Sequence, residues 1–224
     1  VYWGSLWGIA EATLGYVLHM VAIQLPGLPG FVMFPVAFYF MRKAYLANGK
    51  AGAVFQVAVV AALIKCCDFL IQGNIPIRIF NPALSILLEG LAVAAVFTYA
   101  ERRKSTVGFV SVFSMGFLWR AAFLVYLFLI SLIDLPAALV TDGLQLSLRF
   151  LILESFVNAI LMFAYLKIEK TAGVGAVTPV VTYAALETAI MLTMAIEGWR
   201  HGTRDYHHRR HGCREDDGAD TTRP

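Results

Sequence analysis

The chain has 224 residues, of which 59% are hydrophobic and only 15% are charged. Soluble domains carry roughly 25% charged residues, so this composition excludes an ordinary soluble domain and makes the lipid bilayer the first expected partner. The net charge of +3 collects in short loops and in the C-terminal tail. There it indicates membrane orientation and gives no sign of nucleic-acid binding.

Seven apolar segments follow one another along the chain, each close to the ~20 residues that a helix needs to cross a bilayer. Glycine, proline, asparagine and aspartate mark the breaks between them. Membrane-barrel strands would be ~10-residue alternating segments. The sequence therefore predicts an all-α polytopic membrane bundle of about seven transmembrane helices, or six if the last segment does not cross. The segments are residues 2–24, 31–47, 52–72, 82–100, 107–133, 144–166 and 176–198.

The first and the fourth of these segments each lead to a more specific prediction. No small-residue cleavage site follows the first segment, so we expect it to be retained as a helix; because the sequence begins at Val1, an N-terminal piece could be missing. In the fourth segment, Asn81 followed by Pro82 predicts a helix that begins there, with Asn81 as its N-cap.

Lysine and arginine are distributed unequally between the predicted loops. Loops two, four and six carry eight of them, whereas loops one, three and five carry only Arg78. Cytoplasmic loops are enriched in these residues, so we expect the even loops and the N-terminus to lie in the cytoplasm, with the chain in the inner membrane of a cell. The eight residues are Arg42, Lys43, Lys50, Arg102, Arg103, Lys104, Lys167 and Lys170.

A polar tail, residues 200–224, follows the transmembrane domain, which we place at residues 1–199. Its composition predicts disorder. A seventh crossing would put this basic tail outside, so either the tail is tolerated there or the last segment does not fully cross. Donor atoms in a tail without a folded frame do not favour a metal site, so we expect no metal and no cofactor. These donors are His207, His208, His211 and Cys213.

Ionisable residues recur inside the apolar segments, where each costs several kcal/mol unless it is paired or functional. Counted from the basic loops at ~1.5 Å per residue, most of them lie ~18–26 Å above the cytoplasmic boundary. That depth is one layer in the outer half of a ~30 Å core. Glu11 lies near the midplane. The eight residues are Glu11, Lys65, Asp68, Glu89, Arg120, Arg149, Glu154 and Glu187.

Opposite charges in this layer predict pairing. Lys65 and Asp68 are three residues apart on one helix face and can touch directly, and Glu154 shares a face with Asn158. Acids outnumber bases, so the surplus acids are protonated or a cation lies among them. Two interpretations stay open: ion pairs that only hold the bundle together, or a substrate site. Glu89 and Glu187 have no partner on their own helices and favour the site, whereas Arg149 could snorkel to the surface.

Gly4, Gly8 and Ala12 form a small-xxx-small stripe on the first segment. Such a stripe lets another helix approach closely. It predicts either packing within this bundle or a docking face for a separate membrane subunit.

Signatures of common membrane and soluble enzymes are missing from the apolar segments. These segments contain no H-E-x-x-H zinc motif, no paired haem histidines, no G-x-S-x-G elbow and no P-loop. The last segment carries Glu187 and no lysine, which argues against retinal binding. We therefore expect that the chain is not an enzyme.

Small size, six to seven short-looped helices, a cytoplasmic N-terminus and the stripe at Gly4, Gly8 and Ala12 together resemble the substrate-binding S components of energy-coupling factor transporters. The resemblance implies a vitamin or metal site that opens outward. It also implies that the stripe docks a shared transmembrane coupling subunit, which works with ATPases.

We expect an integral membrane transport protein for a small solute, either a substrate-binding subunit or a carrier by itself. The net acidic layer indicates a cationic or zwitterionic solute. The alternatives are a structural or assembly protein whose charges only pair, and a membrane enzyme for lipid or prenyl substrates. The candidate substrate-binding residues are Glu89, Glu187, Arg120, Glu154, Asn158, Glu11, Lys65 and Asp68.

Overall fold

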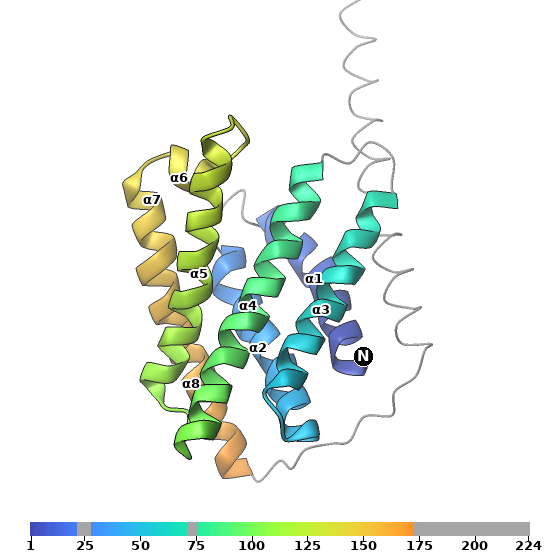
Figure 1. The fold of residues 1–224 in the computed structure, drawn as a ribbon, viewed down its shortest axis with the longest axis vertical. Helices are drawn as coiled ribbons and strands as arrows, with labels where there is room; N and C mark the ends of the chain where they lie inside the picture. The colour runs from blue at the N-terminus through green and yellow to red at the C-terminus, as the bar shows by residue number, and fades with distance from the viewer. Residues whose placement is uncertain (22–27, 71–75, 173–224) are drawn as a thin grey trace, which may run out of the picture.

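The computed structural model describes residues 1–21, 28–70 and 76–172, and every regular element in these ranges is helical (Figure 1). An all-α fold is therefore confirmed for the described part of the chain. The elements are α1 (Tyr2–Val21), α2 (Leu28–Asn48), α3 (Gly52–Cys66), the short 3-10 helix η1 (Cys67–Leu70), α4 (Pro76–Arg103), α5 (Phe109–Ser131), α6 (Ala138–Thr141), α7 (Leu144–Leu148), the π-helix η2 (Arg149–Leu153) and α8 (Glu154–Ala172).

Six of the seven predicted segments correspond to these helices, with α7, η2 and α8 forming the sixth as one continuous run. Segment 176–198 and the tail 200–224 lie outside the described residues. One predicted start is wrong: α4 begins at Pro76, and Pro82 lies inside the helix. Pro76 suits the first helical position because no intrahelical partner is needed for its nitrogen. Asn81 does not cap a helix; its side-chain oxygen accepts a hydrogen bond from the Tyr126 hydroxyl at 2.8 Å.

Four helical runs in the described part of the chain are long and apolar enough to cross a membrane, which supports a helical membrane bundle. Large apolar side chains on their outer faces are well exposed, for example Leu63, Leu91 and Val125, as expected for contact with lipid. With 20 and 21 residues, α1 and α2 are also long, and they pack into the same bundle. The four runs are Gly52–Leu70, Pro76–Arg103, Phe109–Ser131 and Leu144–Lys170.

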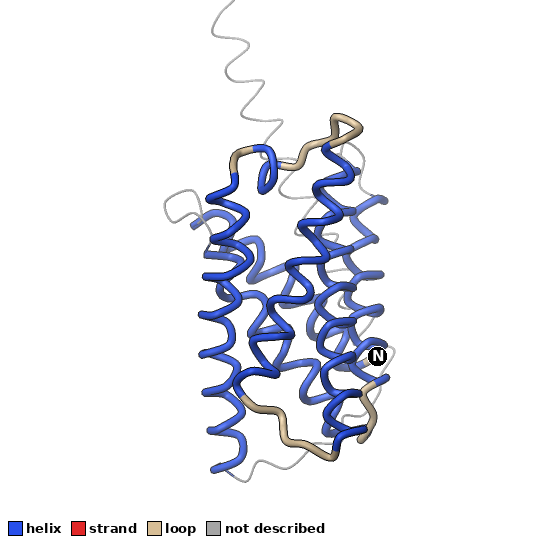
Figure 2. The backbone as a smooth tube through the Cα atoms, turned by 60° about the vertical axis from the view of Figure 1, so that its left-hand side comes forward, coloured by secondary structure: helices blue, strands red, loops and turns tan. Residues whose placement is uncertain are grey.

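Contacts between the long helices run around the bundle and close on themselves. α1 packs on α3, α3 on α4, α4 on α5, α5 on α8, and α8 on α2, which returns to α1. The helices lie side by side along the long axis of the molecule (Figure 2). α2 also contacts α3 and α4, and its Phe34, Phe38 and Met41 are fully buried. A polar group inside this ring is therefore shielded by helices on every side.

Small residues set the closest approaches between helices. A Cβ added at Gly90 of α4 would overlap the Cβ of Ala58 on α3. On α1, an added Cβ at Gly4 would lie 2.7 Å from Val60 Cβ, and one at Gly8 would lie 2.7 Å from Ile64 Cδ1. Because residues without bulk let backbones meet, these glycines fix how α1, α3 and α4 pack.

The stripe predicted on the first segment is thus an internal contact. Gly4 and Gly8 face α3 of the same chain, and Ala12 is buried. The face is not open to a separate subunit in this structure, because α3 already covers it. In this structure, the stripe therefore packs α1 within the bundle.

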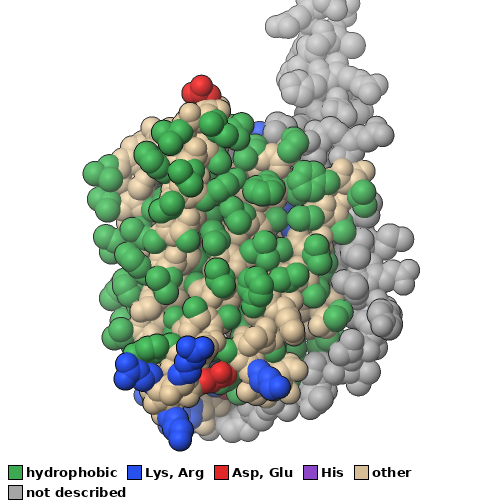
Figure 3. Space-filling model, in the orientation of Figure 1, with side chains coloured by type: hydrophobic (Ala, Val, Ile, Leu, Met, Phe, Trp, Pro, Cys, Tyr) green, Lys and Arg blue, Asp and Glu red, His purple; other side chains and the backbone are tan. Residues whose placement is uncertain are grey.

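The helix ends that carry the basic loops meet at one end of the molecule, which we call the basic end. Glu169 of α8 pairs with Arg42 of α2, and Glu101 of α4 accepts a hydrogen bond from the backbone nitrogen of Ala51, between α2 and α3. Lysine and arginine side chains gather there in the space-filling view, whereas the rest of that face is mostly apolar (Figure 3). The charge asymmetry predicted from the loops is thus an asymmetry of the folded molecule.

Replacing Gly90 with alanine tests the α3–α4 contact. We expect Gly90→Ala to destabilise the purified protein by about 1–3 kcal/mol, because the added methyl group overpacks a site that has no room for it. Thermal unfolding in detergent measures the effect. Gly52→Ala is the matched control, since nothing lies within 4 Å of a Cβ added there. An equal loss of stability in both variants would contradict the close approach of α3 and α4.

Candidate functional site

Arg120 of α5 lies at the centre of the candidate site and has 0% of its surface exposed. Its Nη1 donates to the carbonyl of Gly116 at 3.3 Å, and its Nη2 lies 3.7 Å from Oε2 of Glu154. Three aromatic rings surround the guanidinium, whose Cζ is 4.5 Å from the ring centre of Trp119, 5.3 Å from Phe150 and 5.7 Å from Phe34. Aromatic faces attract cations strongly where water is excluded. The site therefore replaces the hydration of Arg120 with an acid, a carbonyl and three rings.

A π-helical turn brings Glu154 to this arginine. The backbone nitrogen of Glu154 donates to the carbonyl of Arg149, five residues earlier, and closes the wide turn η2. Such π-turns interrupt an α-helix and are frequent at functional sites. Glu154, Ser155 and Asn158, all buried, follow directly. A Cβ added at Gly116 would lie 3.5 Å from Ser155 Cα, so this part of α8 faces α5.

Glu89 of α4 adds a second acid near Arg120. It is 6% exposed, and its charge interacts with those of both Arg120 and Glu11. Its Oε2 atom is buried and has no hydrogen-bond partner among the residues that the structure describes. A carboxylate oxygen without a partner in a dry interior is costly. Glu89 is thus a group of this site that a further contact would stabilise.

Glu11 of α1 links this group to a pair on α3. Its Oε1 accepts a hydrogen bond from Trp7 Nε1 at 3.1 Å, and its charge interacts with that of Lys65. Lys65 in turn binds Asp68, with 2.6 Å between Nζ and Oδ2, so the contact predicted from their spacing is present. Asp68 lies in η1 and is 1% exposed.

Together these side chains form a continuous series across six helical elements of the bundle, which we call the charged row. Neighbours along it interact by charge from one helix to the next, and four of its members are acids against two bases. Arg149 also acts on Glu154 but is not a member of the row. The formal charge stays negative. In order, the row is Asp68, Lys65, Glu11, Glu89, Arg120 and Glu154.

Seven of the eight predicted site residues therefore come together: the six of the charged row, and Asn158 one turn after Glu154. Glu187 lies outside the described residues. Sequence reasoning missed Trp7, Trp119 and Ser155, which enclose the charges. Buried Trp and Ser are common in any bundle, so their residue types carried no signal.

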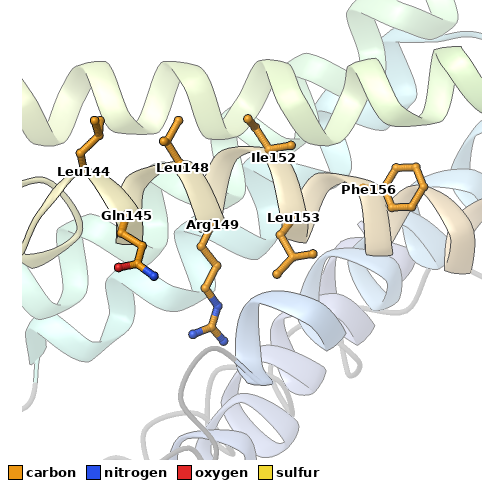
Figure 4. Close-up of a pocket in the computed structure, with 7 residues that line it drawn as sticks. All are labelled: Leu144, Gln145, Leu148, Arg149, Ile152, Leu153 and Phe156. Atoms are coloured by element: carbon orange, nitrogen blue, oxygen red, sulfur yellow. The ribbon is translucent and has the colours of Figure 1, made fainter.

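Arg149 lies apart from the row on the outside of the bundle. It lines a groove of about 640 Å³ along α7, η2 and α8. In Figure 4, Leu144, Leu148 and Ile152 extend along one side of this helical run, and Gln145, Arg149 and Leu153 along the other. The lining includes no acid and no member of the row. Such an apolar groove suits lipid rather than a polar solute.

Glu169 is a further residue that sequence reasoning missed. It accepts from Arg42 at 2.9 Å, from Lys43 at 3.2 Å and from the Tyr165 hydroxyl at 2.8 Å. These contacts tie α8 to α2 at the basic end. Standing between Lys167 and Lys170 in the sequence, Glu169 reads as one more solvated charge, so nothing marked it as buried.

No family model matches the chain, and comparison with curated proteins and with solved structures gives no match. Within residues 1–21, 28–70 and 76–172, no group of three or more His, Cys, Asp or Glu side chains is arranged to hold a metal ion. Any function therefore has to be argued from the charged row and the cavities of this bundle.

Removing the cation at the centre of the row should destabilise the bundle. We expect Arg120→Met to cost about 3–5 kcal/mol, because Glu154 and Glu89 would lose their shared counter-charge inside the protein. The double variant Arg120→Met with Glu154→Gln should recover part of this loss. Unfolding in detergent measures both, with the exposed Arg103→Met as the control. Equal stability of Arg120→Met and Arg103→Met would contradict the pairing.

Proposed function

We propose that the chain is an integral membrane transport protein for a small cationic or zwitterionic solute, and that the charged row binds this solute. One observation carries the proposal: Glu89 and Glu11 are two acids within reach of each other's charge, and Oε2 of Glu89 has no hydrogen-bond partner in the described part of the chain. Intramembrane charges that lack a full set of partners favour a functional role.

Coulomb repulsion makes this pair of acids a natural cation site. Like charges at short range repel strongly where the dielectric constant is low. Lys65 and Arg120 flank the pair, but each also serves another acid, Asp68 and Glu154 respectively. An ammonium group between Glu11 and Glu89 would relieve the repulsion and donate to the open oxygen of Glu89.

Arg120 supports the zwitterionic form of the solute. Its 3.7 Å separation from Glu154 is longer than the about 2.7–2.9 Å of a direct charge-assisted hydrogen bond. A guanidinium is a planar fork that binds a carboxylate with two parallel hydrogen bonds, so a solute carboxylate would compete with Glu154 for Arg120. The same site would thus offer acids to an amine and a cation to a carboxylate.

The row is closed in this structure, so binding requires a movement. Glu89, Arg120 and Glu154 are buried, and neither the groove at Arg149 nor the cavity at the basic end includes any of them among its lining residues. We propose that α8 yields at η2, because the wide π-turn there ends at Glu154.

The complete transporter would have seven crossings, with the N-terminus and the basic end in the cytoplasm and the chain in the inner membrane. Residues 176–198 would supply the last crossing and bring Glu187 to the row. The resemblance to S components of energy-coupling factor transporters supports a substrate-binding subunit that works with a transmembrane coupling subunit and ATPases. In that case another face than Gly4, Gly8 and Ala12 would dock the partner.

A structural or assembly role is the second candidate. The pairs Lys65–Asp68 and Arg120–Glu154 both form inside this chain and would serve as internal links without any ligand. This role predicts that no solute raises the melting temperature, and that an apolar residue in place of Glu89 stabilises the protein.

A thermal-shift screen of the purified protein against amines, amino acids, vitamins and metal ions tests the transport proposal. A solute that binds should raise the melting temperature, and Glu89→Gln should weaken its affinity at least about tenfold, as expected when a buried charged contact is lost. Asp134→Asn is the matched control, because Asp134 is exposed. Unchanged affinity in Glu89→Gln would remove the charged row as the binding site.

A further inference from the structure

A second cavity, of about 790 Å³, opens at the basic end between α2, α4 and α8. This volume lies within the range of about 300–1,000 Å³ that is typical of ligand sites. One side of the cavity is closed by the chain that joins α4 to α5, residues 104–108. The cavity is separate from the charged row, and nothing in the transport proposal uses it.

The lining of this cavity is strongly basic. Arg42, Lys104, Lys167 and Lys170 contribute four positive charges, against Glu101 and Glu169. Both acids are already engaged: Glu169 binds Arg42 and Lys43, and Glu101 accepts from the backbone of Ala51 at 3.0 Å. With four cations against two acids, the lining carries a formal charge of +2. The cavity favours an anion.

The three lysines come from two elements that flank the opening. Lys167 and Lys170 are three residues apart and share a face of α8, and Lys104 sits in the turn after α4 with a positive φ of 51°. All three are exposed, so their ammonium groups can move onto a ligand. Ser105 and Thr106 add hydroxyl donors beside them. This spread of donors suits the several oxygens of a phosphate group.

Part of the cavity lining is apolar. Phe97 is fully buried there, and Val107, Phe163 and Leu166 line the same space. A free phosphate ion would gain nothing from these side chains. A molecule with a phosphate head and a hydrocarbon chain would use both halves of the cavity.

We propose that this cavity binds the phosphate headgroup of an anionic phospholipid. Lys104, Lys167 and Lys170 donate to the phosphate, and an acyl chain lies against Phe163 and Leu166. The cavity stands at the end of helices that are apolar enough to cross a membrane, which is the depth at which headgroups occur. The bound lipid joins α4 and α8 at the end of the bundle opposite η2.

Binding of short-chain phosphatidylglycerol to the full chain in non-ionic detergent tests the proposal, with phosphatidylcholine of the same chain length for comparison. We expect the anionic lipid to bind more tightly. The triple variant Lys104→Gln, Lys167→Gln and Lys170→Gln should reduce its affinity at least about tenfold, because each lysine near a headgroup contributes on the order of a fewfold in affinity.

The matched control removes the same charge at the same end without touching the cavity lining: Lys50→Gln, Arg102→Gln and Arg103→Gln. It should change the affinity less than about threefold, as expected for a general surface effect. Equal losses in both triple variants, or equal affinity for the two lipids, would overturn the proposal. Competition by glycerol phosphate as effective as that by the lipid would also overturn it, in favour of a free phosphate. Lys170→Glu alone keeps the other lysines and should also weaken binding, which covers the case that the triple variant does not fold.

Discussion

Arg120 has no exposed surface, so protein groups must replace the water that would otherwise hydrate its charge. The packing of this bundle depends on those groups. Trp119 comes from its own helix, Phe34 from α2, and Glu154 and Phe150 from the run that contains η2 and α8. Each of these elements is held at the distance that the guanidinium requires. Because an unpaired charge in a dry interior is prohibitively costly, α2, α5 and α8 cannot separate without water or a ligand taking their place. The same constraint therefore stabilises the packing of α2, α5 and α8.

The helices of the described chain were predictable from sequence because a bilayer demands long apolar runs and punctuation between them. That the charged side chains would come together was predictable for a related reason: residue counts from the basic loops, at ~1.5 Å per residue, put them at similar heights along their helices. Local pairing was also within reach, since Lys65 and Asp68 meet through helix spacing alone. Their contact needs no knowledge of any other helix.

The features that sequence did not reveal all depend on neighbours across the bundle. The π-turn before Glu154 changes which way the acid faces, and no residue type encodes such a turn. Glu169 looks solvated in the sequence, yet it contacts two cations from α2 and a tyrosine one turn earlier on α8. The stripe at Gly4 and Gly8 signals close approach, but only the fold identifies α3 as the helix that approaches. The sequence pattern predicts that a close helix contact exists, and the tertiary structure shows which helix makes it.

The contact at Gly90 has a mechanical consequence. There is no room for even a methyl group between Gly90 and Ala58, so α3 and α4 are closely packed and resist sliding past each other. Glu89 is the residue before Gly90 on α4, whereas Glu154 follows the π-turn η2 at the start of α8. A movement of α8 against α3 and α4 would therefore change the distance between Glu154 and Glu89 without altering the contact between α3 and α4. The glycine at this contact would therefore hold Glu89 in place and leave any change of spacing to the helix that carries Glu154.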